Sequence, residues 1–166
     1  MPATSVKRII MIESLKKLLN SRKKTIGSAD DEELKLASAA LLLEAACMDG
    51  NADESEITTV VSLLGGHFKL SKSEASELVD MGREVLKSSV ELYGFTRTIK
   101  NSFNHNDRVR MIEMLWSVVY ADGVLHDFEA NLVRRICGLI YVSDRESGVV
   151  RKRVLERLDL DAKEVS

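Results

Sequence analysis

The sequence predicts an all-α protein, a single domain of about seven to eight helices with an internal duplication. Proline occurs once in the 166 residues, at Pro2, so no later helix is broken by proline. Aromatic residues make up only 5%, which disfavours a large β-sandwich or barrel. Hydrophobic residues make up 45% and charged residues 30%, a globular composition in a chain long enough to bury a core.

Capping boxes mark where the helices begin. In such a box a Ser, Thr or Asp caps the helix, and a Glu three residues later accepts a hydrogen bond from the backbone N–H of the cap. The pair His126/Glu129 has the same spacing with a weaker cap. The other boxes are Asp30/Glu33, Asp53/Glu56, Ser71/Glu74, Ser88/Glu91 and Ser143/Glu146.

Apolar residues at helical spacing define the helices themselves. They predict helices at 6–21, 31–48, 54–66, 72–87, 89–102, 106–121, 127–141 and 144–158. The core faces of the second, sixth and seventh of these are predicted to hold Leu34, Leu41, Leu42 and Ala45; Ile112, Leu115, Trp116 and Val119; and Val133, Ile136, Cys137 and Ile140.

Charge divides the chain into a basic amphipathic leader helix, 1–25, and a helical domain, 26–166. Residues 1–24 carry seven Lys or Arg against one acid, whereas the rest carries 17 against 25. A basic helix over residues 6–24 can lie on an anionic membrane surface, or it can dock on the domain or on a second copy of it. An acidic body is not typical of nucleic-acid binders, so no nucleic-acid partner is predicted.

The cysteines and the N-terminal pattern favour a cytoplasmic protein, with a peripheral position at the inner membrane as the alternative. Cys47 and Cys137 lie in apolar helical patterns without a CxxC spacing, which predicts buried, unreactive thiols in a reducing compartment. Lys and Glu interrupt the N-terminal apolar run, and no 18-residue apolar stretch occurs. Neither a signal peptide nor a membrane span is therefore expected.

One motif, D-G-x-x-x-x-x-E, occurs twice. Asp49-Gly50 precedes Glu56, and Asp122-Gly123 precedes Glu129, at an offset of 73 residues. Apolar positions on either side align at the same offset. We therefore expect repeat units near 31–87 and 106–158, packed about a pseudo-two-fold axis.

The repeated motif has a metal interpretation and a structural one. An EF-hand loop has the same Gly-to-Glu step, but its first and third ligands would fall on Ala45 and Cys47, or on Val118 and Tyr120. These residues offer no carboxylate. In the structural interpretation, each Gly ends a helix in the left-handed conformation and the Glu completes a capping box. That interpretation explains each position of the motif.

A third interpretation is an acidic site. An Asp at a helix C-terminus is disfavoured by the helix dipole, by a few tenths of a kcal/mol, and so calls for compensation. If the two turns meet, a divalent cation or a basic partner would relieve the repulsion between their carboxylates. The candidate ion- or partner-binding residues are Asp49, Asp53, Glu56, Asp122, His126 and Glu129. Candidate metal ligands are Asp49, Glu56, Asp122 and Glu129.

The stretches ELYGFT, MLWSVVYADGVLHDFEANLVRRI and SDRESGVVRKRVL resemble the TerB family of tellurite-resistance-associated proteins. The resemblance covers residues 31–158, with Met48 where the family usually has Ala. It implies a compact helical fold from cytosolic stress-response systems, related to the N-terminal domain of DnaJ-like co-chaperones of the DjlA type. It also implies ion or partner binding by the acidic motif residues, with no established enzymatic activity.

The sequence contains no nucleophile elbow, phosphate-binding loop, dinucleotide glycine motif or HExxH. We therefore expect a non-enzymatic interaction or ion-sensing module with a protein partner, able to form a homodimer. The alternatives are a peripheral membrane adaptor and, more weakly supported, an enzyme of unknown reaction.

Overall fold

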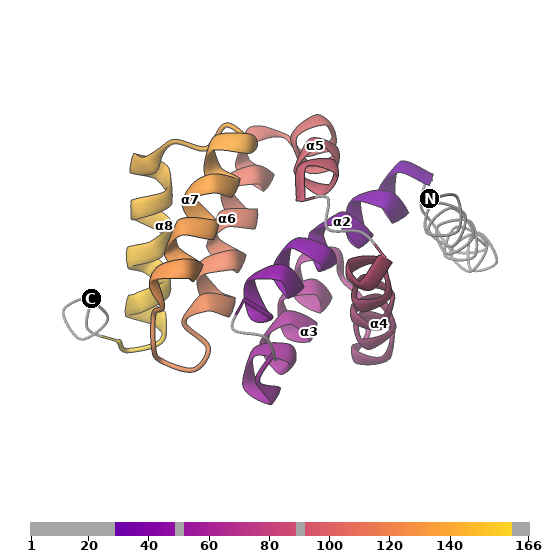
Figure 1. Cartoon of the computed structure of the whole chain (residues 1–166), viewed down its shortest axis with the longest axis horizontal. Coiled ribbons are helices and arrows are strands. Elements are labelled where there is room, and N and C mark those ends of the chain that lie inside the picture. The colour runs from indigo at the N-terminus through magenta and orange to yellow at the C-terminus, as the bar shows by residue number, and fades with distance from the viewer. Residues whose placement is uncertain (1–28, 49–51, 89–91, 161–166) are drawn as a thin grey trace.

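The computed structural model describes residues 29–48, 52–88 and 92–160, and within these ranges it contains α-helices and no strand. The all-α fold class is thus confirmed. The helices, labelled in Figure 1, are α2 Ala29–Ala46, α3 Glu54–Phe68, α4 Lys72–Ser88, α5 Leu92–Ser102, α6 His105–Val119, α7 Asp127–Leu139 and α8 Asp144–Arg157.

Local sequence signals account for the helix boundaries. No predicted boundary from residue 31 onward lies more than three residues from the observed one. Ser71 and Ser143 cap α4 and α8 as expected. In each box the Ser hydroxyl accepts from the backbone N–H of the Glu and the Glu carboxylate accepts from that of the Ser, at 2.9–3.2 Å.

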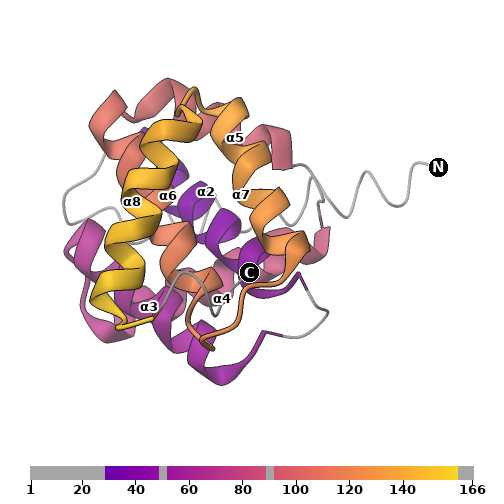
Figure 2. The ribbon, with the colours of Figure 1, turned by 90° about the vertical axis from the view of Figure 1, so that its left-hand side faces the viewer.

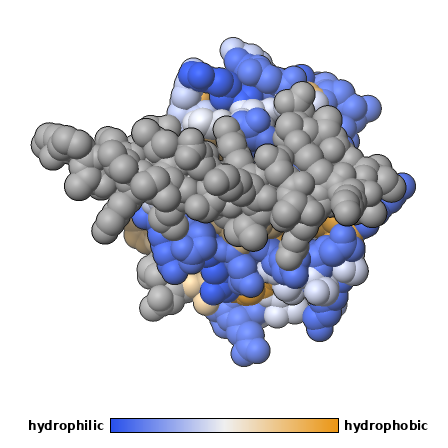
Figure 3. Space-filling model, turned by 90° about the vertical axis from the view of Figure 1, so that its right-hand side faces the viewer, coloured by the Kyte–Doolittle hydropathy of each residue, from blue (hydrophilic) through white to orange (hydrophobic). Residues whose placement is uncertain are grey.

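The predicted leader, 1–25, lies outside the described residues. Its helix at 6–21 and the membrane-surface contact of residues 6–24 stay predictions. In the part of the chain that is described, no helix is both long and apolar enough to cross a membrane. Figure 3 shows the α4 side of the molecule, where hydrophilic side chains make up most of the coloured surface.

The central helix is α2, which contacts α3, α4, α5, α6 and α7. Every residue from 37 to 43 is buried. The four predicted core residues of this helix are buried, but so are residues on its other sides, Ala39, Ala40 and Leu43 among them. A helix that is apolar all round belongs in the middle of a core, and its small Ala side chains let neighbouring helices approach closely.

The approach of α4 to α2 depends on a glycine. A Cβ atom added to Gly82 would lie 2.8 Å from Leu43 Cδ1 and 3.4 Å from Ala39 Cβ. Such a contact is closer than carbon atoms tolerate, and Leu43 is fully buried. Gly82 therefore offsets its poor helix propensity by allowing α2 and α4 to pack tightly.

The helices form two triples, α2–α4 and α6–α8, which stand on opposite sides of Figure 1 with α5 between them. Their contacts correspond. The first helix of each triple contacts the other two, and the second helix contacts the first helix of the other triple, since α3 contacts α6 and α7 contacts α2. This reciprocity is what a pseudo-two-fold arrangement requires, and it supports the proposed duplication.

Two aromatic residues, one in α6 and one at its C-cap, hold α8 in place. Trp116 Nε1 donates to Ser147 Oγ at 3.1 Å, and Arg151 Nε donates to the Tyr120 hydroxyl at 2.6 Å. The Arg151 guanidinium also lies 5.1 Å from the centre of the Trp116 ring, a cation–π contact. Trp116 and Tyr120 are both buried, which confirms Trp116 on the predicted core face.

Candidate functional site

The second Asp-Gly turn agrees with the structural interpretation in the conformation of its Gly but not in its place, because α6 already ends at Val119 with Tyr120 as its C-cap. Gly123 has φ +80°, a backbone conformation that glycine adopts at little cost, and its N–H donates to Tyr120 O at 2.9 Å. Asp122 Oδ1 accepts a hydrogen bond from the Val124 backbone N–H at 3.0 Å. This bond compensates for placing an acid beyond a helix C-terminus. The first turn, with Asp49 and Gly50, lies outside the described residues.

The two motif glutamates act as helix caps from buried positions. Glu56 is 2% exposed and accepts from the Asp53 backbone N–H at 2.9 Å. Glu129 is 3% exposed and accepts from the His126 backbone N–H at 3.1 Å. Each carboxylate therefore satisfies a backbone donor at the start of α3 or α7.

The electrostatics of Glu129 relate the starts of α3 and α7. Burial raises the pKa of its carboxyl, and the nearby carboxylates of Asp122 and Glu56 raise it further, against the lowering effect of the His126 N–H and side chain. Glu56 lies at the start of α3 and Glu129 at the start of α7, so the structure brings these two helix starts within electrostatic range of each other. Both helices begin at the same end of the molecule (Figures 1 and 2).

An exposed surface of mixed character surrounds these glutamates. Asp53, Asp122 and His126 are exposed, as are Glu54 and Asp127. Two large apolar side chains beside them also face solvent, Val124 at 52% and Phe128 at 66% exposed. We call this surface the acidic face and define it by Asp53, Asp122, Val124, Asp127 and Phe128.

The EF-hand interpretation does not fit the helices. Ala45 and Val118, which would be the first ligands of the two loops, are buried in α2 and α6. Within the ranges that the structure describes, no three His, Cys, Asp or Glu side chains are grouped so that they could hold a metal ion. Asp49, one of the four candidate metal ligands, lies outside those ranges.

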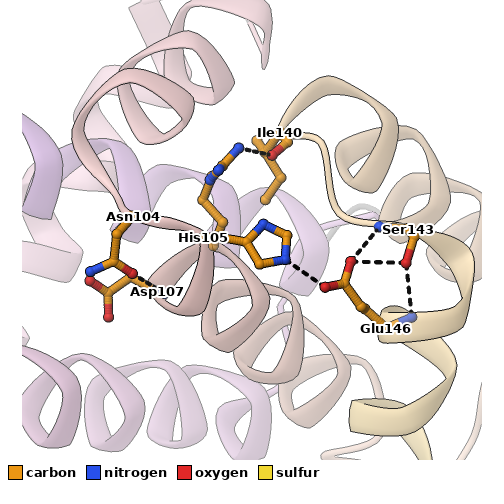
Figure 4. A network of polar contacts seen from close by, with 7 residues as sticks. Asn104, His105, Asp107, Ile140, Ser143 and Glu146 are labelled. Atoms are coloured by element: carbon orange, nitrogen blue, oxygen red, sulfur yellow. Dashed lines mark hydrogen bonds and ion pairs between the residues drawn. The ribbon is translucent and has the colours of Figure 1, made fainter.

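The structure also places a histidine for which the sequence offered no partner. His105 Nε2 lies 2.5 Å from Glu146 Oε1, and Figure 4 shows how the Glu146 carboxylate lies between His105 of α6 and Ser143 at the start of α8. The contact with His105, followed by hydrogen bonds from Ser143, lowers the pKa of Glu146 to about 2. Beside it, Arg108 donates to Ile140 O at 2.9 Å, which ties α6 to the end of α7.

Both cysteines are free thiols. Cys137 is buried as predicted, whereas Cys47 is only partly buried, at the end of α2. Burial is the main cause that raises the pKa of each thiol above its ordinary value. A raised pKa keeps a thiol protonated and weakly nucleophilic at neutral pH, which agrees with the predicted unreactive thiols.

Comparison with known proteins gives one finding. The family model described as "Tellurite resistance protein TerB" matches residues 35–152. That range contains α3 to α7 whole, most of α2 and α8, and both Asp-Gly turns. No curated protein and no solved structure gives a significant match.

Proposed function

Because the chain belongs to the TerB family of tellurite resistance proteins, we propose that it is a non-enzymatic interaction module of a bacterial stress system. Its ligand is a protein segment with basic and apolar side chains, and it binds at the acidic face. The observation that carries this proposal is the exposure of Phe128, 66%, in the same short segment of the chain as the exposed Asp122 and Asp127.

Two kinds of side chain on the acidic face support this ligand class. An exposed phenyl ring beside an exposed Val offers an apolar anchor of the kind that contributes most to protein interfaces. The surrounding carboxylates attract Lys or Arg and speed the encounter with a basic partner. Beneath them, Glu56 and Glu129 add negative potential, which a bound cationic group would relieve.

Site-specific photo-crosslinking in cells tests the proposal. A photoreactive residue would replace Phe128 in one variant and Val149 of α8, which is 55% exposed, in a matched control. We expect an adduct at position 128 that is absent at position 149 and that disappears when Asp122→Asn and Asp127→Asn are added. Adducts shared by both positions, or none at position 128, would contradict the proposal, and an adduct with a second copy would identify a homodimer.

Ion sensing is the second candidate, favoured by the raised pKa of Glu129 near two other carboxylates. Calorimetric titration of the metal-stripped protein with Ca²⁺, Mn²⁺ and Zn²⁺ separates it from partner binding. Saturable heat that is lost in both Asp49→Asn and Asp122→Asn would make the turns an ion site. Equal heat in wild type and in both variants would exclude these turns as its source.

A further inference from the structure

An open groove of about 440 Å³ lies between α3, α6 and α8, where helices of the two triples meet. The three helices are seen together in Figure 2. The volume falls within the range of sites that hold small organic molecules. None of the residues that line this groove belongs to the acidic face.

Arginine dominates the charge of the groove. Arg110 of α6 and Arg153 and Arg157 of α8 line it, and the carboxylate among its lining residues is Glu113. Three arginines and one glutamate leave a formal charge of +2, in a chain whose net charge is −2. This local excess of positive charge attracts anions to the groove.

Two of the three guanidinium groups are held in position. Arg153 Nη1 and Arg157 Nη1 each lie 3.3 Å from a different oxygen of Glu113, and Arg157 Nη2 donates to Ser117 Oγ at 2.7 Å. The Glu113 side chain is only 16% exposed, so its carboxylate is largely shielded from solvent beneath the Arg153 and Arg157 guanidinium groups. Since a guanidinium has five N–H donors, donors remain on both for a ligand.

The third guanidinium, that of Arg110, differs from these two. Arg110 makes no hydrogen bond or ion pair with any residue that the structure describes, and it is exposed. Its charge nevertheless reaches His67, whose pKa is lowered mainly by burial, while the Asp107 carboxylate raises it and the Arg110 guanidinium lowers it. His67 Nδ1 is buried without a hydrogen-bond partner among the described residues, and the ring lines the same groove.

We propose that this groove binds the phosphate group of a small organic molecule. A phosphate monoester carries close to two negative charges at neutral pH, which balances the +2 of the groove. Its three terminal oxygens accept from guanidinium groups on two helices, whereas a monocarboxylate would leave one charge unbalanced. Leu63 and Met114 line the same groove and offer an apolar surface for the organic body.

Calorimetry on the full chain with phenyl phosphate, inorganic phosphate and benzoate tests this assignment. We expect saturable binding that is tightest for phenyl phosphate. Equal affinity for inorganic phosphate would contradict a contribution of the organic part of the ligand to binding. Tighter binding of benzoate would contradict a preference of the groove for phosphate. Absence of saturable binding by phenyl phosphate would overturn the site.

Arg110→Gln is the informative variant because Arg110 makes no bond that the described fold needs. We expect it to weaken phenyl phosphate at least about tenfold, the loss of one charge-assisted hydrogen bond. Arg135→Gln removes the same charge at an exposed position of α7, outside the groove. We expect this variant to bind phenyl phosphate with the affinity of wild type. Equal weakening by both variants would overturn the site, because only the overall charge would then matter.

Amide chemical shifts locate the binding independently. On titration with phenyl phosphate, the largest shifts are expected at Ser62, Gly66 and Ser117, which line the groove. The amide signals of Gly123 in the second turn and of Phe128 in α7 are expected to stay unchanged. The opposite pattern would overturn the groove as the site.

Discussion

Glu56 and Glu129 occupy equivalent positions in α3 and α7. Each is the third residue of its helix, each is almost fully buried, and each accepts a hydrogen bond from the backbone N–H that precedes the helix. Burial raises the pKa of Glu129, and the charge of Glu56 raises it further. The Glu129 carboxylate therefore both stabilises the start of α7, by accepting a hydrogen bond, and destabilises the folded state, by placing a buried charge near another carboxylate. Substitutions at Glu129 can separate the two effects.

Glu129→Gln retains an oxygen that caps the His126 N–H and removes the charge, so we expect a protein no less stable than wild type at pH 7. Glu129→Ala also removes the acceptor, and we expect it to be less stable by about 1–3 kcal/mol. Because burial raises the folded-state pKa of Glu129, its contribution to stability is full below pH 4.5 and is lost as pH rises through the folded pKa. The free energy of unfolding, measured by urea denaturation, should thus fall in wild type relative to Glu129→Gln as the pH rises from 4.5 to 7. The same pH dependence in both proteins would contradict this.

Gly82→Ala tests the close packing of α2 and α4. We expect a loss of about 1–2 kcal/mol in the free energy of unfolding, since overpacking against Leu43 exceeds the gain of about 1 kcal/mol in helix propensity. Gly148→Ala is the matched control in α8, where an added Cβ meets nothing within 4 Å, and it should gain about 1 kcal/mol. Chemical denaturation measures both, and equal effects would show that packing at Gly82 is unimportant.

Lys69 ends α3 with φ 55°, and the Leu70 N–H behind it donates to Gly65 O at 2.9 Å. Since a left-handed conformation strains residues with a Cβ, Lys69→Gly should raise the free energy of unfolding by about 1 kcal/mol. Lys152→Gly, at an exposed position inside α8, should instead lower it by about 1 kcal/mol. Thermal unfolding of the two variants distinguishes them by the sign of the change in Tm.

The contact between His105 and Glu146 predicts an acidic titration. Glu146 should titrate with a pKa of about 2 in wild type and closer to its ordinary 4.5 in His105→Ala, where the Ser143 hydrogen bonds remain. Because the folded-state pKa is lowered, this contribution to stability is present above pH 4.5 and is lost as pH falls toward 2. Carbon-13 NMR of the side-chain carboxyl measures both values, and the same pKa in both proteins would mean that His105 has no influence.

Features that depend on neighbouring residues were accessible from the sequence. Capping boxes and glycines act within one turn of the chain, which is why the helix starts at Glu54, Asp127 and Asp144 were predicted to the residue. The predicted core residues of α6 and α7 are also buried, although α7 buries one stripe whereas every residue of α6 from 114 to 119 is buried. For α2 a single stripe was expected, and the burial of all its sides depends on how many helices surround it.

Features that join distant residues were not accessible. Glu113 meets Arg153 and Arg157 across 40 and 44 residues, and His105 meets Glu146 across 41. Their spacing follows no periodicity that a single helix would impose. The groove and the His105 contact could therefore be found only once α6 and α8 lay side by side.

The central position of α2 has a consequence for biosynthesis. This helix buries more of its circumference than a surface helix does, yet it is synthesised before the other described helices. Among the helices that contact it, α7 is made last and ends at Leu139, 93 residues after the end of α2. At roughly 5–20 residues per second, the ribosome needs about 5–19 s to complete that interval. Throughout this time the nascent chain holds an apolar segment whose partners have not all been made, so a chaperone that shelters it co-translationally would raise the yield of folded protein.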